Sequence, residues 1–402
     1  MSRINAVGII AEYNPFHKGH EYHIAQSKKI TGADCTVVVM SGNFVQRGEP
    51  AIIDKYIRSN MALQCGADLV IELPVKCALG SSSYFSMGSI KILNALKVNN
   101  LCFGSEYGDL AVFTKVADLI INNSDKIDSI IHEHVKTGIS YPLARNNAIL
   151  QCIGNTVPKD FITKPNNILG LEYILEIKNQ KADITPHTIK RIGNEYHNTE
   201  ISGAFASASA LRTNIFSNPL MFYDNIPSEC TEILKEYFKK FKPVFIDDFT
   251  DIIFYKLMEI KNNREIYEND IADLPDYLLN RLFKNVESAK NVTALIESAK
   301  TKDITYTRIS RALMHLLLDI KEDDYLKLKT QPCPYIRVLG FNDAGQKYLA
   351  SVKKDIKYPI IVKPADYKDE LKQDIYASDI YNMILSHKSG TETVNDYKRK
   401  TR

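Results

Sequence analysis

INAVGIIAEYNPFHKGHEYHI, residues 4–24, joins a short apolar run to a segment with helical spacing through an Asn-Pro-Phe turn. An apolar run of this length, bounded by turn residues, indicates a buried strand. His17 and His20 flank Gly19 where the helix would begin. Ligands of open α/β sheets bind at the carboxyl ends of strands, so this order predicts an α/β fold with a binding edge at residues 14–20.

The same alternation continues over the next hundred residues. Further strand-like runs stand at residues 35–40 (CTVVVM), 67–74 (ADLVIELP) and 99–106 (NNLCFGSE), with segments of helical spacing between them. Strands and helices at such intervals predict a Rossmann-like parallel sheet with right-handed crossovers. After about residue 216 helix-like segments dominate, although YIRVLGF and YPIIVKP suggest a few late strands. We therefore expect an α/β domain over residues 1–216 and a mainly α-helical domain over residues 217–402.

Bulk composition excludes several classes of protein. The 402 residues are 45% hydrophobic and 25% charged, with a net charge of +3, and this length favours two domains. No apolar run approaches the ~18 residues of a membrane helix and no basic-then-apolar leader follows Met1, so we expect a cytoplasmic protein without a membrane partner. The seven cysteines are scattered and form no C-x-x-C pair. They indicate neither a disulfide framework nor a zinc site, and we expect no tightly bound metal or prosthetic group.

The residues at the start of the expected first helix have a definite chemical use. A helix amino terminus presents unpaired amides and a partial positive charge to an anion. His17, Lys18 and His20 can donate hydrogen bonds to one phosphate, and Gly19 leaves room for its close approach. Transfer at phosphorus depends on such fixed donors. We therefore predict that His17, Lys18 and His20 are catalytic residues of a nucleotide site; the alternative is that the histidines are surface or capping residues.

Several segments resemble, in this order, the tRNA(Met) cytidine acetate ligase family of the HIGH-type nucleotidyltransferase superfamily. They are VGIIAEYNPFHKGHEYHI, VVVMSGNFVQRGEPAIIDKYIRSNMALQCGADLVIELP, FGSE, PNNILGLEY, IKRIG followed by YH, and ASASALR. The resemblance is dense over residues 1–215 and continues thinly through YTRISRALMHLLL and YIRVLGFNDAGQKYL. It implies a nucleotidyltransferase domain at residues 1–216 and a tRNA-binding role for residues 217–402.

The family's activity is likewise implied by the resemblance. It is an ATP-dependent ligase reaction in which acetate is adenylated and the acetyl group passes to the exocyclic amine of the wobble cytidine of elongator tRNA(Met), giving N4-acetylcytidine. The residues alone indicate a nucleotide site, but neither acetate nor this tRNA. Mg²⁺ would be carried with ATP by its phosphate oxygens. The ATP-binding residues that the resemblance implies are Val7, Gly8, Ile9, Ile10, Ala11, Glu12, Tyr13, Asn14, Pro15, Phe16, His17, Lys18, Gly19, His20, Gly104, Asn166, Arg191 and Ile192.

Two more groups of polar residues are candidates for substrate contacts. We expect Ser207, Ser209 and Arg212 to bind the β and γ phosphates, the alternative being an ordinary helix N-cap. The family often has threonine in place of Ser209, and both residues carry a hydroxyl. A separate hypothesis places an acetate pocket near Asn43, Arg47 or Lys55. The alternative for Lys55 is a charged surface turn.

Basic residues of the second half are candidates for contact with tRNA. An RNA-modifying enzyme must hold the phosphate backbone and present an unstacked base to its active site. The candidates are Lys239, Lys240, Lys242, Arg308, Arg311, Lys398, Arg399 and Lys400. A run of charges is also typical of an ordinary solvated surface.

Two other functions remain open from the residues. One is an adenylyltransferase that makes a dinucleotide cofactor, against which the large helical region argues. The other is a non-catalytic RNA-binding protein that keeps a vestigial nucleotide fold, against which the intact His17, Gly19, His20 and Arg212 argue.

Overall fold

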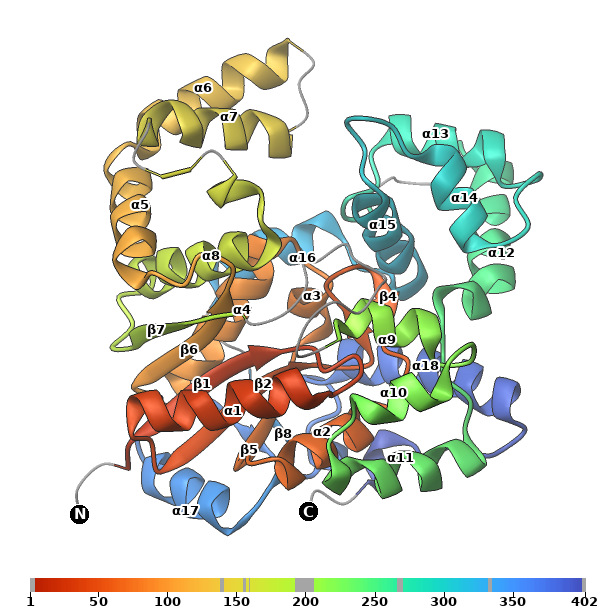
Figure 1. Cartoon of the computed structure of the whole chain (residues 1–402). Helices are drawn as coiled ribbons and strands as arrows, with labels where there is room; N and C mark the ends of the chain where they lie inside the picture. Colours follow the sequence, from red (N-terminus) through yellow and green to blue (C-terminus); the bar gives the residue numbers. More distant parts are fainter. Residues whose placement is uncertain are drawn as a thin grey trace.

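A seven-stranded sheet forms the centre of the computed structural model, which describes residues 4–137, 141–154, 157–158, 160–191, 206–265, 270–331 and 335–399 (Figure 1). Its strand order is β7-β6-β1-β2-β5-β8-β9. The strands are β1 (Ala6–Ala11), β2 (Cys35–Ser41), β5 (Leu69–Leu73), β6 (Asn100–Ser105), β7 (Thr185–Lys190), β8 (Ile336–Phe341) and β9 (Ile360–Ile361). All neighbours pair in parallel except β5 and β8. The predicted α/β fold with a mainly parallel sheet is confirmed.

The strand order reverses beside β1. From β1 the chain adds β2 and β5 on one side, and then returns to place β6 and β7 on the other. Such a reversal leaves a crevice at the carboxyl ends of the two strands that flank it, where α/β proteins bind ligands. Residues 12–20 follow β1 and residues 106–109 follow β6, so both lie at this point of the sheet.

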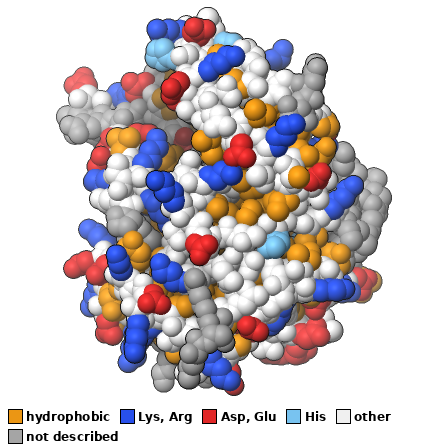
Figure 2. Space-filling model, turned by 90° about the vertical axis from the view of Figure 1, so that its left-hand side faces the viewer, with side chains coloured by type: hydrophobic (Ala, Val, Ile, Leu, Met, Phe, Trp, Pro, Cys, Tyr) orange, Lys and Arg blue, Asp and Glu red, His pale blue; other side chains and the backbone are white. Residues whose placement is uncertain are grey.

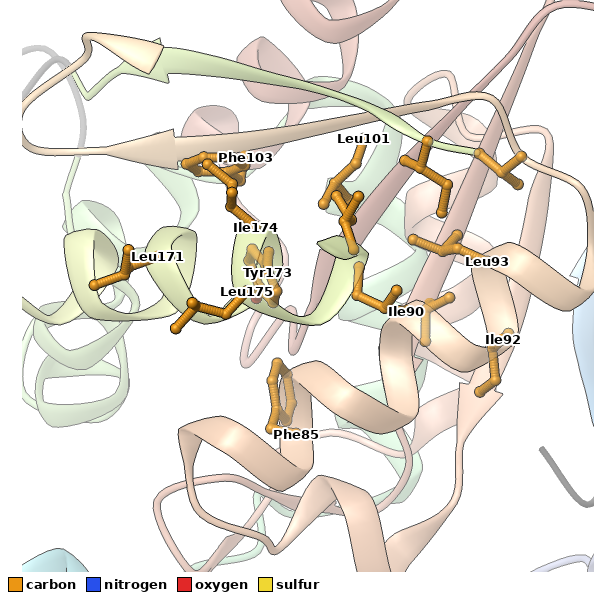
Figure 3. Close-up of a cluster of buried hydrophobic side chains, with 14 of the residues drawn as sticks. Phe85, Ile90, Ile92, Leu93, Leu101, Phe103, Leu171, Tyr173, Ile174 and Leu175 are labelled. Carbon is orange, nitrogen blue, oxygen red and sulfur yellow. The ribbon is translucent and has the colours of Figure 1, made fainter. Parts of the chain in front are cut away.

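Helices cover both faces of the sheet because the strands alternate their apolar side chains. In β2, Val37 and Val39 belong to a core that includes α4 (Ser82–Ala95), α8 (Pro165–Asn179) and α17 (Asp343–Val352). Figure 3 shows α4, α8 and β6 contributing side chains to this core. Val38 and Met40 belong to the opposite core, with α1 (Lys18–Thr31), α2 (Lys55–Gln64) and α11 (Ser228–Lys240). The period of two in β2 therefore decides which helices each residue meets.

The remaining elements surround this centre. Two short strands, β3 (Phe44–Val45) and β4 (Glu49–Pro50), form a hairpin after β2. The other α-helices are α3 (Val75–Ala78), α5 (Leu110–Asn122), α6 (Ser124–Lys136), α7 (Tyr141–Ile153), α9 (Ala208–Asn214), α10 (Pro219–Asp224), α12 (Thr250–Asn262), α13 (Asp276–Asn285), α14 (Val292–Ala299), α15 (Tyr306–Leu318), α16 (Glu322–Thr330) and α18 (Lys372–Ser389). Short 3₁₀ turns stand at Phe161–Thr163, Ile246–Phe249, Pro364–Asp366 and Asp396–Lys398. Within the described residues, no helix has the length and apolar character needed to cross a bilayer.

The boundary expected at residue 216 does not divide the sheet. Strands β8 and β9 come from the second half of the chain, and β8 pairs antiparallel with β5. A strand that pairs antiparallel needs no crossover helix, so the alternation that marks a parallel sheet gives no signal for it. The rest of the second half is helical, as expected, but its core also takes in Phe44, Val75 and Leu79 of the first half. The two halves therefore share both a sheet and a core.

Candidate active site

The start of α1 forms a compact group of rings at the carboxyl end of β1. His17 is the N-cap of α1, and its Nδ1 accepts a hydrogen bond from the backbone N–H of Gly19 at 3.1 Å. The backbone N–H of His17 in turn donates to Nδ1 of His20 at 3.3 Å. The two imidazoles stack with their centroids 3.8 Å apart. We call His17, Lys18, Gly19 and His20 the histidine cradle.

Capping fixes the tautomer of both imidazoles. A neutral imidazole whose Nδ1 accepts a hydrogen bond carries its proton on Nε2. Burial lowers the pKa of His17 to about 3, and the charge of Arg191 adds to the effect. Burial, with the charges of His17 and Arg191, also lowers the pKa of His20 well below its ordinary value. Both rings are therefore neutral Nε2–H donors at pH 7. The sequence left capping and ligand binding as alternative roles for these histidines. The two roles are compatible, because capping uses Nδ1 and leaves Nε2 for a ligand.

His23 is a candidate site residue that the sequence reasoning missed. It lies one turn after His20 on α1, and its Nε2 is buried without a hydrogen-bond partner among the described residues. Burial lowers its pKa to about 4, helped by the charge of Arg191. A buried polar atom without a partner costs roughly 1–3 kcal/mol, so its presence calls for an explanation, and a bound ligand is one. The sequence does contain a signal for His23: His17, His20 and His23 are spaced three residues apart, which places all three near one face of the helix.

The end of β6 supplies the opposite wall of the crevice. A Cβ atom at Gly104 would lie 3.4 Å from Cγ of Arg191, so glycine leaves the space beside that side chain open. The backbone N–H of Arg191 donates to the carbonyl of Ser105 at 2.9 Å, and its side chain is exposed. Nδ2 of Asn166 donates to Glu106 at 2.7 Å. Ile192, the last ATP-binding candidate, lies outside the described residues.

Helices α9 and α10 close the third side of the cradle. NH1 of Arg212 donates to the carbonyl oxygen of Asn14 at 2.8 Å, and its NH2 to Oγ of Ser209 at 3.3 Å. Ser207 caps α9, since its Oγ accepts a hydrogen bond from the backbone N–H of Ala210 at 3.1 Å. The structure thus brings Arg212 and Ser209 to the turn before the cradle, whereas Ser207 already serves the N-cap that was its alternative role.

Lys18 points away from its histidine neighbours. Its Nζ donates to the carbonyl oxygen of Asp224 at 2.6 Å, and its backbone N–H to the carbonyl of Asn225 at 2.9 Å. Asn225 also accepts, through Oδ1, from the backbone N–H of Ala206 at 3.1 Å. The first turn of α1 is therefore held by the end of α10.

The chain is similar to known proteins over nearly its whole length. The sequence pattern described as HIGH Nucleotidyl Transferase matches residues 4–396. A tRNA(Met) cytidine acetate ligase of Thermoanaerobacter sp. (strain X514) is 41% identical over 392 residues, which cover 95% of this chain and 96% of that protein. Another, of Acetivibrio thermocellus, is 38% identical over 401 residues, which cover 96% of each protein. This chain belongs to the tRNA(Met) cytidine acetate ligase family.

Solved structures of a relative agree with this assignment. Thermotoga maritima TmcAL in its apo form matches with a TM-score of 0.90 at 29% identity, over 99% of both chains. A second structure of that protein, bound with alpha-thio ATP, matches with a TM-score of 0.88 over the same share of both chains. The predictions of a nucleotidyltransferase fold and of an enzyme of the ligase class are confirmed.

In this ligase, the predicted acetate candidates separate into two environments. Asn43 is buried, its Oδ1 accepts from the backbone N–H of Lys55 at 2.9 Å, and its Nδ2 has no partner among the described residues. Arg47 is partly buried in the turn of the β3–β4 hairpin. Lys55 is fully buried, and its Nζ lies 2.8 Å from Glu72, 2.7 Å from Asp396 and 2.8 Å from Ser378. Lys55 is therefore buried and held by carboxylates of its own chain, which corrects its alternative as a surface residue. Its place in the acetate pocket stays a prediction that these contacts do not favour.

Lys55 belongs to a group of four buried charges, which we call the buried charge cluster: Lys55, Glu72, Arg337 and Asp396. Arg337 NH1 lies 3.0 Å from Glu72 and its NH2 lies 2.6 Å from Asp396. No member is more than 4% exposed. Burial alone would raise the pKa of Asp396, but the charges of Lys55 and Arg337 lower it overall. Two cations and two carboxylates thus balance one another where β5 ends and β8 begins.

The candidate tRNA residues lie on several elements. Lys239 pairs with Glu236 on the exposed side of α11, close to the exposed Lys240 and Lys242. On α15, Arg311 pairs with Asp273 at 3.2 Å, and Arg308 is half-buried. The exposed Lys398 lies at the last 3₁₀ turn, Arg399 covers the ring of Tyr56 at 4.8 Å, and Lys400 lies outside the described residues. Lys and Arg are also interspersed with Asp and Glu on the face in Figure 2, so no single basic block marks an RNA site there.

Proposed function

We propose that this chain uses ATP to join acetate to the exocyclic amine of the wobble cytidine in elongator tRNA(Met), through an acetyl-adenylate. The observation that carries the proposal is the pair of neutral Nε2–H donors at the start of α1, at the point where the strand order reverses. Membership of the family supplies the identity of both substrates, and alpha-thio ATP bound to the Thermotoga maritima relative supports ATP as the nucleotide.

The first step would be attack of an acetate oxygen on the α-phosphorus of ATP, with pyrophosphate leaving. His17 and His20 would donate Nε2–H bonds to phosphate oxygens, where negative charge shifts during the transfer. Arg191, which is exposed and permanently charged, and Arg212 beside Asn14 would bind the remaining phosphate charge. Ser209, whose Oγ lies 3.3 Å from Arg212, would assist that guanidinium.

Acetate would bind at the turn between β2 and α2. Asn14 and Asn43 are buried, and each uses its Oδ1 to cap a backbone N–H of this turn, at Ile52 and Lys55 respectively. Their Nδ2 groups have no hydrogen-bond partner among the described residues. Two buried amide donors suit a carboxylate, and the partly buried Arg47 follows in the next hairpin. The expected acetate ligands are therefore Asn14, Asn43 and Arg47.

Mg²⁺ would be held by the oxygens of ATP. Mg²⁺ prefers oxygen ligands, carboxylates above all, and two carboxylates near the cradle already have partners: Glu49 lies 3.8 Å from Arg212, and Glu12 accepts from the backbone N–H of Gln46 at 2.9 Å. Glu106, at the end of β6, is likewise bonded to Asn166 and to the backbone of Asn167 at 2.8 Å. When bound with ATP, the ion would offset charge on the phosphates.

The second step would be attack of the cytidine amine on the acetyl carbonyl carbon. The carbon–nitrogen bond forms, AMP leaves with the electron pair of the broken carbon–oxygen bond, and the amine loses one proton. Neutral His17 and His20 could hold the departing AMP through the same Nε2–H donors. The cytidine must leave its stack to reach the crevice, and the basic residues of α11, α15 and the last 3₁₀ turn are the candidates for holding the tRNA backbone.

The test is transfer of radiolabelled acetate, with ATP and Mg²⁺, to purified tRNA that lacks the modification, followed by nucleoside analysis. We expect label in N4-acetylcytidine of tRNA(Met), and its loss in His20→Ala. If ATP is cleaved but no label reaches RNA, the adenylyltransferase alternative replaces this proposal. If neither reaction occurs with a folded protein, the chain is a binding protein.

A further inference from the structure

Two thiols from distant parts of the chain meet between α2 and α11. The Sγ atoms of Cys65, at the end of α2, and Cys230, in α11, lie 3.3 Å apart, although 165 residues separate them. Cys65 is 9% exposed and Cys230 is fully buried. Because a disulfide bond measures about 2.05 Å, these are two separate thiols in close contact.

Two carboxylates from neighbouring helices complete the group. Glu21 stands in the first turn of α1 and Glu229 in the first turn of α11. One carboxylate oxygen of each and the Sγ of Cys65 all lie within 4.8 Å of one another. Over the part of the chain that the structure describes, no other three His, Cys, Asp or Glu residues converge this closely. Three ligand-type side chains thus converge on one place, and the thiol of Cys230, in contact with Cys65, is the candidate for a fourth.

The like charges of Glu21 and Glu229 oppose each other, although hydrogen bonds to its own backbone and to Ser228 lower the pKa of Glu229. Burial raises the pKa of Glu21, and the negative charge of Glu229 raises it further. Contact with Cys65 and burial raise the pKa of the Cys230 thiol. Lys18 counteracts the effect on Glu21, but its ammonium lies at 2.6 Å from the carbonyl oxygen of Asp224. A divalent cation at the centre would favour the charged forms of all four groups.

The donor set indicates which cation would bind. Thiolates select soft or borderline metals over Mg²⁺ and Ca²⁺, and Zn²⁺ takes four ligands from cysteine, histidine and carboxylates. Zn–S and Zn–O distances of about 2.3 and 2.0–2.2 Å require ligand atoms closer than 4.8 Å, so the two glutamate side chains would have to move towards the thiols when the ion binds. A disulfide would consume the thiols but leave the two carboxylates facing each other.

We propose that Cys65, Cys230, Glu21 and Glu229 form a four-coordinate Zn²⁺ site that joins α1 to α2 and α11. Each thiol that binds releases one proton, so the affinity rises with pH. All four positions are then filled by protein, which makes the site structural. The ion would affect activity only indirectly, because it would fix the position of α1, the helix that begins with the histidine cradle.

The experiment uses the full chain, reduced and stripped of metal by a chelator. Zn²⁺ is titrated against a chromophoric competitor, and Co²⁺ is added in parallel to detect the absorption of cobalt–thiolate bonds. We expect one ion per chain with a thiolate signal. Cys65→Ser and Cys230→Ser should abolish both the Zn²⁺ binding and the cobalt–thiolate signal. Loss of an outer-shell partner of a metal typically weakens its binding about 10- to 100-fold, and Glu21→Gln should weaken Zn²⁺ binding by at least that much. Cys152→Ser is the matched control, because Cys152 is a partly buried thiol in α7, and it should bind as the wild type does.

Folding is checked by far-ultraviolet circular dichroism of the metal-free proteins, and Glu21→Gln keeps the test valid if Cys230→Ser fails to fold. The proposal is overturned if the wild type binds less than one Zn²⁺ per chain or shows no cobalt–thiolate band. It is also overturned if a folded Cys65→Ser retains the ion, or if thiol counting on the chain as purified finds Cys65 and Cys230 joined in a disulfide. None of these readouts depends on ATP, acetate or tRNA, so the result is independent of the proposed reaction.

Discussion

The histidine cradle and the buried charge cluster lie at the same edge of one sheet, but their polar atoms are partnered differently. In the buried charge cluster, Lys55 has contacts with Glu72, Asp396 and Ser378 at 2.7–2.8 Å. Around the cradle, Nε2 of His23 and the Nδ2 atoms of Asn14 and Asn43 have no partner among the described residues.

The difference separates structure from function better than residue type does. Lysine is a common ligand for anionic substrates, yet Lys55 forms ion pairs with two carboxylates of its own chain, one from β5 and one from the last 3₁₀ turn. His17 and His20, by contrast, accept the capping hydrogen bonds with Nδ1 and keep Nε2 for another partner. A satisfied buried group therefore predicts a loss of stability on mutation, and an unsatisfied one predicts a loss of binding or rate.

The largest expected effect comes from breaking the buried charge cluster. Lys55→Met leaves Glu72 and Asp396 with only Arg337, and removing one partner of a buried ion group costs about 3–5 kcal/mol. We expect the free energy of unfolding, measured by chemical denaturation, to fall by that amount. The double variant Lys55→Met/Asp396→Asn should lose less, because it removes one charge of each sign. Lys327→Met, which breaks an exposed pair with Asp323, is the control and should cost about 0.5 kcal/mol or less. A loss below 1 kcal/mol in Lys55→Met would contradict the comparison.

The second effect falls on rate rather than stability. His20→Ala removes one Nε2–H donor from the cradle, and loss of such a donor typically costs about 10²–10³ in kcat, or 2.7–4 kcal/mol. The same variant loses the capping bond to the backbone of His17, which costs about 1 kcal/mol of stability. Acetyl transfer to tRNA and chemical denaturation measure the two separately. His387→Ala, at the exposed end of α18, should leave both unchanged. Equal losses of stability in His20→Ala and Lys55→Met would remove the distinction between the two regions.

The third effect is a pH dependence that originates in the cradle. His17 and His23 have pKa values of about 3 and about 4 when folded, whereas both titrate near 6.5 when unfolded. Between these values only the unfolded chain binds the protons. Stability is therefore complete above about pH 6.5 and falls as the pH drops towards 4, by at most about 1.4 kcal/mol per pH unit for each imidazole.

Chemical denaturation at pH 7 and pH 5 measures this dependence. His23→Gln removes one of the buried imidazoles at the start of α1, so its loss of stability between the two pH values should be smaller than that of the wild type. His387→Gln changes an exposed histidine and should behave as the wild type does. An unchanged pH dependence in His23→Gln would mean that its imidazole is not held neutral by burial.

Local features of this fold were predictable from the sequence, and contacts between distant segments were not. The strand, turn and helix of residues 4–24 carry their own signals, so the sheet and the cradle followed from spacing. The pairing of β8 with β5 and the contact of Cys65 with Cys230 each join segments more than 160 residues apart. No period or motif marks such contacts. Lys55 shows the same limit, because its second carboxylate, Asp396, lies 341 residues away.

The smallest expected effect distinguishes two arginines on one face of α15. Arg311 pairs with Asp273 at 3.2 Å, whereas Arg308 has no ion pair with any residue that the structure describes. If α15 contacts tRNA, Arg308→Ala should weaken tRNA binding and reduce the slope of log K against log salt by about 0.7–0.9, as expected for one lost phosphate contact. Arg311→Ala should change that slope less, because its charge is already offset. Filter binding across a series of salt concentrations measures both slopes.

Equal slopes in the wild type and Arg308→Ala would mean that the tRNA does not contact α15 at this residue. The same assay on Lys240→Ala would then test the exposed end of α11.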